Sequence, residues 1–316
     1  MAMSMGSFAT RTVATLVVAT DGTGDFTDIQ TAINALPAKG GCVYIKEGTY
    51  TLTDHIEILI DNVRVEGCGF CTILILDAVV NTDVFTIGDI THHPDNIVIA
   101  SLKIDGNRAA QTAGVLSGIR LNQESDDCII ENCQIVNCYS YGIYMKVGLR
   151  NRIANNYITD CTTIGIYLYR NDASNIIIGN NIQGNDGIGI KLEDYSAENI
   201  ITGNIINDNI GDGIYIYGAN KNIINSNIIE NNGIRFSPAN GVFLDTSDET
   251  VIMGNVIRVN EGYGVDVSNV ACDNTIILGN VIKGNSTGQI NDAGTDTHPN
   301  GVIGTNSLAI DDLNEI

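Results

Sequence analysis

Charged and aromatic side chains recur at two alternating positions of a short apolar stretch that repeats along the chain. In Gly189-Ile190-Lys191-Leu192-Glu193, apolar Ile190 and Leu192 alternate with Lys191 and Glu193, the period of a strand with one buried face. The equivalent positions of the other copies predict two outward columns. The first column is Arg120, Tyr144, Tyr167, Lys191, Tyr215, Phe243 and Asp266, and the second is Asn122, Lys146, Tyr169, Glu193, Tyr217, Asp245 and Ser268.

Five of the twelve tyrosines fall in these two columns. Exposed aromatic rings at one-strand intervals offer flat apolar surfaces to sugar rings, while their hydroxyls can bond to sugar hydroxyls. We therefore predict a surface that binds an extended polysaccharide. The alternative is an aromatic stack that stabilises parallel strands or is buried against a neighbouring subunit. The predicted substrate-binding residues are Arg120, Tyr144, Lys146, Tyr167, Tyr169, Arg170, Tyr215, Tyr217 and Phe243.

Two kinds of sugar chemistry could use the charges in these columns. A glycoside hydrolase needs a carboxylic acid and a carboxylate partner about 5 to 9.5 Å apart. Asp245 and Asp266, roughly 8 Å apart on adjacent strands, fit this better than Glu193 and Asp245 at about 10 Å. A polysaccharide lyase needs a base near cations that neutralise a uronate, and Lys191 beside Arg170 would serve. The alternative is a solvated strand face with weak ion pairs. The predicted catalytic residues are Lys191, Glu193, Asp245 and Asp266.

No cofactor is predicted, and the signal for a metal is weak. A calcium site needs several carboxylates that converge on one point. The candidates are Glu193 with Asp194 and Asp245 with Asp248. Cys68 and Cys71 form a CxxC pair, but no second pair or His cluster stands at the spacing of a zinc site.

The formal net charge of -21 argues against nucleic acid as a partner, because phosphate backbones require a clustered basic surface. The longest N-terminal apolar run, residues 14–19, is too short to cross a bilayer and lacks the layout of a signal peptide. We therefore expect no membrane partner. An extracellular or virion-surface location is expected, and the predicted oligomeric state is a monomer or a homotrimer.

Segments that begin near residues 127, 151, 175, 199, 222, 250 and 274 realign at a spacing of about 24 residues. Each copy shows two short strands and two turns, so successive copies are expected to stack as coils with parallel strands. Stacked Asn side chains then satisfy backbone groups at the corners. One predicted ladder is Cys133, Asn156, Asn180, Asn204, Asn227, Asn255 and Asn280, and the other is Cys138, Cys161, Asn185, Asn209, Asn232, Asn260 and Asn285.

These observations predict an all-β fold, a right-handed parallel β-helix, as a single domain over residues 1–316. Residues 1–50 are expected to form an N-terminal cap and the opening strands, residues 51–290 the coils, and residues 291–316 a C-terminal cap or tail. The cap is predicted to hold a helix, because Thr27-Asp28-Ile29-Gln30 resembles a capping box and Ile29, Ala32, Ile33 and Leu36 share one helical face.

Residues 21–30 (DGTGDFTDIQ) and 43–50 (VYIKEGTY) resemble the N-terminal segment of pectate-lyase-like β-helix proteins, a superfamily that includes polysaccharide lyases and phage tailspikes. Residues 102–108 (LKIDGNR) also resemble a stretch of alginate C5-epimerase modules. Those modules carry an Asp-Pro-His-Glu run where this chain has residues 141–146 (YGIYMK), so epimerase chemistry of that kind is not expected.

The resemblance implies a carbohydrate-active protein, because the superfamily includes lyases, hydrolases, epimerases and esterases. Together with the outward columns, it predicts a protein that binds an extended polysaccharide and cleaves it as a lyase or hydrolase. The alternative is a non-catalytic, tailspike-like shaft that binds glycans or serves as a structural element.

Overall fold

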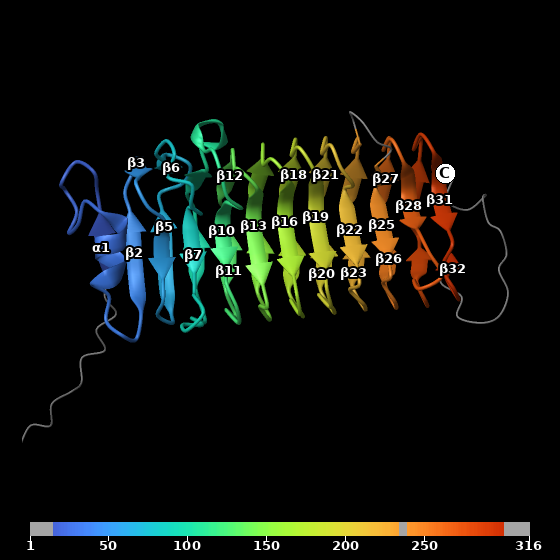
Figure 1. Ribbon diagram of the computed structural model, residues 1–316, viewed down its shortest axis with the longest axis horizontal. Helices are drawn as coiled ribbons and strands as arrows, with labels where there is room; N and C mark the ends of the chain where they lie inside the picture. Colours follow the sequence, from blue (N-terminus) through green and yellow to red (C-terminus); the bar gives the residue numbers. More distant parts are fainter. Residues whose placement is uncertain (1–14, 234–238, 300–316) are drawn as a thin grey trace, which may run out of the picture.

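The computed structural model describes residues 15–233 and 239–299 as an elongated parallel β-solenoid (Figure 1). Its strands form three parallel sheets of twelve, ten and ten strands, here named sheets A, B and C. The predicted all-β solenoid is confirmed. The described chain holds only one α-helix, α1 (Ile29–Asn34), and one 3₁₀-helix, η1 (Arg108–Ala110).

From β2 onward, consecutive strands along the chain belong to different sheets, so each full coil contributes one strand to each sheet. Sheet A contains β1 (Thr15–Val18), β2 (Gly41–Ile45), β5 (Val63–Gly67), β8 (Val98–Ala100), β11 (Ile129–Glu131), β14 (Arg152–Ala154), β17 (Ile176–Ile178), β20 (Ile200–Thr202), β23 (Ile223–Asn225), β26 (Val251–Met253), β29 (Ile276–Leu278) and β32 (His298–Pro299). Sheet B contains β3 (Gly48–Leu52), β6 (Thr72–Leu76), β9 (Lys103–Asp105), β12 (Gln134–Val136), β15 (Tyr157–Thr159), β18 (Asn181–Gln183), β21 (Ile205–Asn207), β24 (Ile228–Glu230), β27 (Val256–Arg258) and β30 (Val281–Lys283). Sheet C contains β4 (Ile56–Ile58), β7 (Phe85–Ile87), β10 (Ser117–Leu121), β13 (Tyr141–Lys146), β16 (Ile164–Tyr169), β19 (Ile188–Glu193), β22 (Ile214–Tyr217), β25 (Val242–Asp245), β28 (Tyr263–Val267) and β31 (Gly288–Asp292).

A coil therefore has three strands, whereas the sequence predicted two. The stretch that includes β17 and β18 bends at Gly179, where φ is +67°, and this bend separates the strand of sheet A from that of sheet B. Gly and Asn adopt the left-handed backbone conformation at such a corner with little strain. A short run rich in these residues can therefore contain a change of sheet that the sequence does not reveal.

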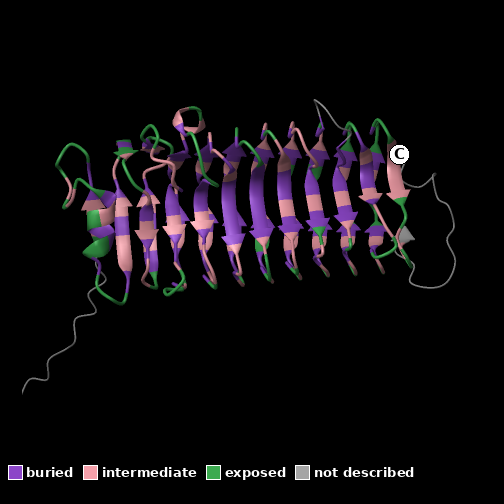
Figure 2. Cartoon of the chain, viewed as in Figure 1, coloured by how far each residue is buried: buried purple, intermediate pink, exposed green. Residues whose placement is uncertain are grey.

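One continuous core of stacked Ile, Val and Leu side chains fills the solenoid, and Figure 2 shows buried residues along its whole length. Both predicted ladders are confirmed inside it. Asn180 shows the pattern: its Oδ1 accepts from Asn156 N at 2.9 Å, and its Nδ2 donates to Ile153 O at 2.9 Å and to Asn204 Oδ1 at 3.0 Å. The side chains thus link successive coils and satisfy backbone groups that no strand pairs.

The sequence missed a third buried ladder at the corner that leads into sheet A. In that ladder the side-chain oxygen of each Asn accepts from the backbone N–H of the equivalent residue one coil earlier, as between Asn175 and Asn151 at 2.7 Å. Its members are Cys128, Asn151, Asn175, Asn199, Asn222, Thr250 and Thr275.

Helix α1 lies at the N-terminal end of the solenoid, where Ile29, Ala32 and Ile33 join the core. Its N-cap is Asp28, whose Oδ1 accepts from Thr31 N at 2.7 Å. The predicted capping box at Thr27 is therefore wrong by one residue.

The side chain of Gln30 does not reach back to the start of the helix, as a capping box requires. It bonds instead to the backbone of Glu57 in β4, with Glu57 N donating to Gln30 Oε1 at 2.7 Å. A tertiary contact has replaced the local one, and it ties the helix to sheet C.

Candidate functional site

Sheet C carries both predicted outward columns in register on neighbouring strands from β10 to β28. We call this face the ribbon. In the first column Tyr167 pairs with Lys191 and Lys191 with Tyr215, and in the second Tyr169 pairs with Glu193. Because each coil adds one parallel strand to sheet C, equivalent side chains of successive coils lie on the same face. The alternation in the sequence therefore predicts the columns correctly.

The N-terminal half of the ribbon, on β10 to β19, is closely packed. Tyr144 and Tyr167 are only 9% and 8% exposed, so the expectation that these two rings face solvent is wrong. Their ring centroids lie 5.4 Å apart, and Tyr141, from a column that the sequence analysis did not use, lies 5.2 Å from Tyr167. Strands β13 and β16 accordingly consist almost wholly of buried residues (Figure 2).

The predicted catalytic residues Lys191 and Glu193 form an ion pair with 2.7 Å between Nζ and Oε2, and Tyr167 donates its hydroxyl to the same carboxylate oxygen. Burial favours the neutral form of Glu193, but the hydrogen bonds from Lys191 and Tyr167 outweigh it and lower the pKa of this carboxyl. Burial and the bond to Glu193 raise the pKa of Tyr167. The Lys191 ammonium also lies 5.2 Å and 5.3 Å from the ring centroids of Tyr167 and Tyr215.

Two predicted binding arginines also have partners. Arg120 Nε donates to Asp83 Oδ2 at 2.7 Å, and its guanidinium lies 5.0 Å from the Tyr144 ring centroid. Arg170 lies at the corner after β16, outside the two columns, with its guanidinium 4.9 Å from the Tyr169 ring centroid. These two cations stabilise the aromatic cluster, which consists of the Tyr141, Tyr144, Tyr167 and Tyr169 rings. The remaining predicted cation, Lys146, ends β13 beside Tyr169 of the next strand.

The C-terminal half of the ribbon, on β22 to β28, is more open. Tyr215 and Phe243 form a pair of rings with centroids 5.0 Å apart, and the adjacent Tyr217 is 39% exposed. The predicted catalytic residues Asp245 and Asp266 follow on the next strands but have separate partners. Asp245 accepts hydrogen bonds from Thr246 and Asn269, and Asp266 accepts from Asn240 and Asn291.

Asp212, which the sequence analysis missed, lies two residues before β22 and belongs with Asp266. Asn240 N donates to Asp212 Oδ1 at 2.6 Å, while Asn240 Nδ2 donates to Asp266 Oδ2 at 3.2 Å. Burial raises the pKa of Asp212 to about 6; the hydrogen bond from Asn240 opposes this shift, and the charge of Asp266 adds to it. The signal in the sequence was the acidic residue between Gly211 and Gly213, where the preceding copy has Ile188.

A groove of about 610 Å³ runs beside the C-terminal half of the ribbon, along the corners between sheets C and A. It includes the exposed Tyr195 and Tyr217 rings. The lining residues are Asp194, Tyr195, Tyr217, Gly218, Asn220, Thr246, Asp248, Val270, Ala271, Asp273 and Thr295.

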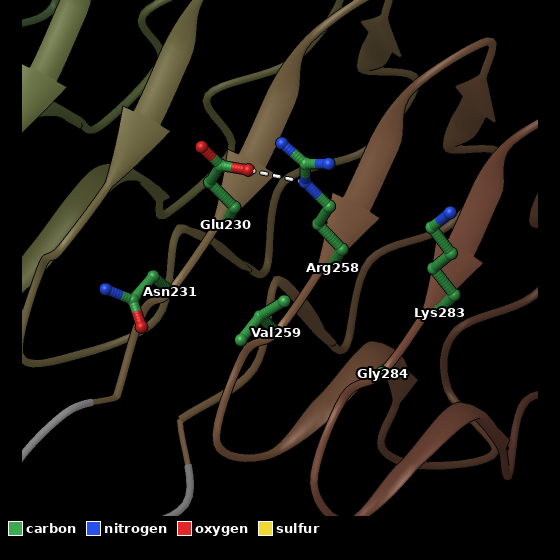
Figure 3. Close-up of a pocket in the computed structure, with 6 residues that line it drawn as sticks. All are labelled: Glu230, Asn231, Arg258, Val259, Lys283 and Gly284. Carbon is green, nitrogen blue, oxygen red and sulfur yellow. Dashed lines mark hydrogen bonds and ion pairs between the residues drawn. The ribbon is translucent and has the colours of Figure 1, made fainter.

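A second, open hollow of about 490 Å³ lies along the ends of the sheet B strands β24, β27 and β30, away from the ribbon (Figure 3). In it Glu230 Oε2 is 2.6 Å from Arg258 Nε, and Lys283 follows on the next strand. The carboxylate is already neutralised by its arginine, so we assign no chemistry to this hollow.

Within residues 15–233 and 239–299, no group of three or more His, Cys, Asp or Glu side chains is arranged to hold a metal ion. Of the calcium candidates, Glu193 is engaged by Lys191, and Asp248 Oδ1 accepts from Asp273 N at 3.0 Å. In the same part of the chain, no helix has the length and hydropathy needed to cross a membrane.

Two family models match the chain by sequence. The right-handed β-helix region matches residues 90–236, and a family described as periplasmic copper-binding protein (NosD) matches residues 194–308. No curated protein matches the chain.

Many solved structures match the chain, and the following three share less than 20% sequence identity with it. A Geobacillus virus E2 protein, ORF18, aligns with TM-score 0.71 and 16% identity over 85% of this chain and 55% of its own. The A-module of Azotobacter vinelandii mannuronan C-5 epimerase AlgE4 aligns with TM-score 0.61 and 19% identity over 86% of this chain and 95% of its own. The enzymatically active domain of bacteriophage CBA120 tailspike protein 2 aligns with TM-score 0.67 and 13% identity over 85% of this chain and 44% of its own.

This chain therefore spans about half the length of the two phage proteins, and at these identities the likeness concerns the fold. The sheet topology, the family match and these structures agree with one another. The protein is a right-handed parallel β-helix.

Proposed function

We propose that the protein binds an extended glycan along the ribbon and cleaves it at the C-terminal half of the ribbon. The observation that carries this proposal is the arrangement on β22 to β28, where the open rings of Tyr215, Phe243 and Tyr217 lie beside outward carboxylates. Flat rings one coil apart suit successive sugar rings, and carboxyl groups are the usual acid and base of glycoside hydrolysis. The names of two structurally similar proteins, a mannuronan epimerase and an enzymatically active tailspike domain, support a polysaccharide as the substrate class.

The geometry favours hydrolysis over lyase chemistry. A lyase would need Lys191 as the base, but its ammonium is held by Glu193 at 2.7 Å and by two aromatic faces. The ion pair and the two ring contacts occupy the amine, so its geometry does not suit the removal of a proton from a sugar ring. In this proposal Lys191 and Glu193 hold the glycan, while carboxyl groups further along the ribbon carry out the reaction.

The net charge of -21 also favours a neutral glycan over a uronate polymer, because the ribbon's Lys191 and Arg120 charges are compensated by Glu193 and Asp83. A polyanion would meet repulsion that no surplus of positive charge offsets. We therefore expect turnover of neutral polysaccharides first.

The test is a screen of purified protein against neutral and uronate polysaccharides that records both reducing ends and the ultraviolet absorbance of unsaturated products. Hydrolysis gives reducing ends without the absorbance, and we expect this result. Tyr215→Ala should weaken binding about tenfold or more, whereas Glu198→Gln, an exposed corner residue away from the ribbon, should act as the wild type. Unsaturated products would overturn the hydrolase assignment, and no cleavage with no binding would overturn the whole proposal.

A second candidate, a non-catalytic shaft built from several copies, is favoured by the outer face of sheet A. Three exposed apolar side chains stand there: Ile176 at 36%, Met253 at 40% and Leu278 at 41%. Exposed aliphatic columns in an acidic protein are a typical oligomer surface. Sedimentation equilibrium distinguishes the two: a trimer that lacks cleavage activity would favour the shaft, and an active monomer the hydrolase.

A further inference from the structure

Asn240 donates hydrogen bonds to two carboxyl groups on the ribbon, those of Asp212 and Asp266. We propose that Asp212 is the general acid of the glycan-cleaving site, that Asp266 is its carboxylate partner, and that Asn240 positions both. This inference rests on the proposed function. It replaces Asp245, the partner suggested by strand spacing alone, with a residue that lies outside the alternating strand positions.

The spacing of the pair suits hydrolysis with inversion. Asp212 and Asp266 are two coils apart, and in strand register Asp266 lies three positions further along, in line with Tyr215. Their backbones are therefore about 10 Å apart along the axis and about 10 Å apart along the strand direction. Both carboxyl groups bond to Asn240 in the coil between them, so their oxygens lie closer together than their backbones. Inverting enzymes separate the two carboxyls by roughly 6.5–9.5 Å, which leaves room for one water molecule.

The surroundings of the two carboxyls differ, as expected if Asp212 is the general acid and Asp266 its carboxylate partner. Asp212 is half-buried, with Ile188 on the preceding strand, Tyr215 on its own coil and the Asp266 charge nearby. Loss of water and a neighbouring negative charge both favour the protonated form. Asp266 instead accepts hydrogen bonds on both carboxylate oxygens, from the side-chain amide of Asn240 at Oδ2 and from that of Asn291 at Oδ1, which orient it as an acceptor.

The chemical step is the addition of water across one glycosidic bond. The Asp212 carboxyl gives its proton to the bridging oxygen, which takes the electron pair of the breaking bond to the anomeric carbon. Asp266 removes a proton from water while the water oxygen forms the new bond to that carbon. Asp212 is then ionised and Asp266 protonated, and exchange with solvent restores both. The Phe243 ring lies on the coil between the two carboxyls, next to the Tyr215 ring on the coil of Asp212, and a sugar ring would stack on this pair.

Four variants and a pH profile on the most rapidly cleaved glycan test this assignment. Asp212→Asn and Asp266→Asn should each lower kcat about 100-fold or more. Asp245→Asn, a carboxylate of the same ribbon with separate partners, should change kcat less than about tenfold. Asn240→Ala removes the side-chain amide that bonds to Asp266 but keeps the backbone N–H that bonds to Asp212. It should lower kcat with little change in KM and leave the alkaline limb of the pH profile in place, whereas a general loss of packing would change all three. In the wild type kcat should fall as the pH rises past about 6, as Asp212 loses its proton.

The outcomes separate this inference from the proposed function. Cleavage that survives in Asp212→Asn but is lost in Asp245→Asn would overturn the assignment and leave the hydrolase proposal standing. If the wild type cleaves no glycan, the proposed function fails, and the catalytic roles fail with it. Circular dichroism of each variant shows whether the coils remain folded, and carbon-13 NMR of the carboxyl groups follows the Asp212 titration directly.

A second, independent observation is the close approach of two thiols in the turn between β5 and β6. The Sγ atoms of Cys68 and Cys71 lie 3.4 Å apart, and Cys71 is exposed. Gly69, with φ +93°, forms the turn that brings them together. The other thiols of the described chain are less accessible: Cys42 is half-buried, and Cys128, Cys133, Cys138, Cys161 and Cys272 are buried.

From this geometry we infer that Cys68 and Cys71 form a reversible disulfide by exchange with a small disulfide such as oxidised glutathione. One protein S–S bond forms, the S–S bond of glutathione breaks, and its two sulfurs leave as thiols with the two protons of the cysteines. Incubation with oxidised glutathione should lower the intact mass by two hydrogens and remove two thiols that react with Ellman's reagent, and reductant should restore both. Cys71→Ser should abolish the internal bond. Failure to lose these thiols, or pairing through Cys42, would overturn the inference.

Discussion

The two halves of the ribbon share one backbone and differ in what their outward side chains contact. On β10 to β19 the side chains contact one another: Tyr144 and Tyr167 are buried, and Glu193 accepts from both Lys191 and Tyr167. On β22 to β28 the rings stay more open, and the carboxyl groups of Asp212 and Asp266 bond mainly to amides. Because outward positions of a solenoid are free of the demands of the core, one half can stabilise the sheet while the other keeps groups available for a ligand.

The halves also differ inside the solenoid. Four ladder positions of the N-terminal coils hold Cys128, Cys133, Cys138 and Cys161, where the following coils use Asn. A thiol fills space but forms only weak hydrogen bonds, whereas a ladder Asn links three coils. The C-terminal half therefore depends more on its ladders, and the N-terminal half more on the aromatic cluster of its outer face.

The largest expected effect is the loss of a ladder Asn from the C-terminal half. Asn204→Ala would leave Asn180 N without its acceptor, Asn180 Nδ2 with only one of its two acceptors, and Ile177 O without its side-chain donor. We expect a loss of about 3 kcal/mol or more in the free energy of unfolding, because each buried polar group that remains unpaired costs roughly 1–3 kcal/mol. Urea unfolding followed by circular dichroism measures this loss.

The matched control for this prediction is Cys133→Ala, which removes a ladder side chain in the N-terminal half. Its thiol lies 3.3 Å from Glu131 O, so the cost should be only about 1 kcal/mol. Equal losses in the two variants would show that the Asn hydrogen bonds do not distinguish the halves.

The next largest effect concerns the ion pair in the N-terminal half. Glu193→Ala would leave the largely buried Lys191 ammonium and the Tyr167 hydroxyl without their acceptor. We expect a loss of about 2 kcal/mol in the free energy of unfolding, the range of hydrogen bonds to charged groups. Glu198→Ala, at an exposed corner, should cost much less.

The double variant Lys191→Met with Glu193→Ala should recover part of that loss, because no unpaired ammonium remains in the cluster. Thermal unfolding of the single and double variants gives the coupling energy. Additive losses would contradict the view that these side chains form one packed unit with Tyr167.

Most of the fold could be predicted from the sequence, because a period of about 24 residues and stacked Asn positions constrain each coil to resemble the next. The columns of the ribbon followed from the alternation around Lys191 and Glu193. The burial of Tyr144 and Tyr167 did not, since it depends on side chains from neighbouring coils and on Tyr141 in a further column. The position of Asp212 before Gly213 breaks the alternation, and its link to Asp266 passes through Asn240, which the sequence analysis had no reason to place between them.

The smallest expected effect is a pH-dependent gain in stability on removing the Asp212 charge. The pKa of Asp212 is about 6 in the folded protein against an ordinary value of 3.8. The folded state therefore holds this proton more tightly than the unfolded state, so ionisation destabilises the fold. That penalty is absent below about pH 3.8, grows as the pH rises to 6 and is fully present above it. Asp212→Asn keeps an acceptor for Asn240 N and removes the charge, so it should raise Tm by about 2 °C at pH 8 and by much less at pH 4. Differential scanning calorimetry at both values, with Glu198→Gln as the control, measures the difference. An equal shift at pH 4 and pH 8 would show that the substitution changes the stability of the open half by some means other than removing the charge of Asp212.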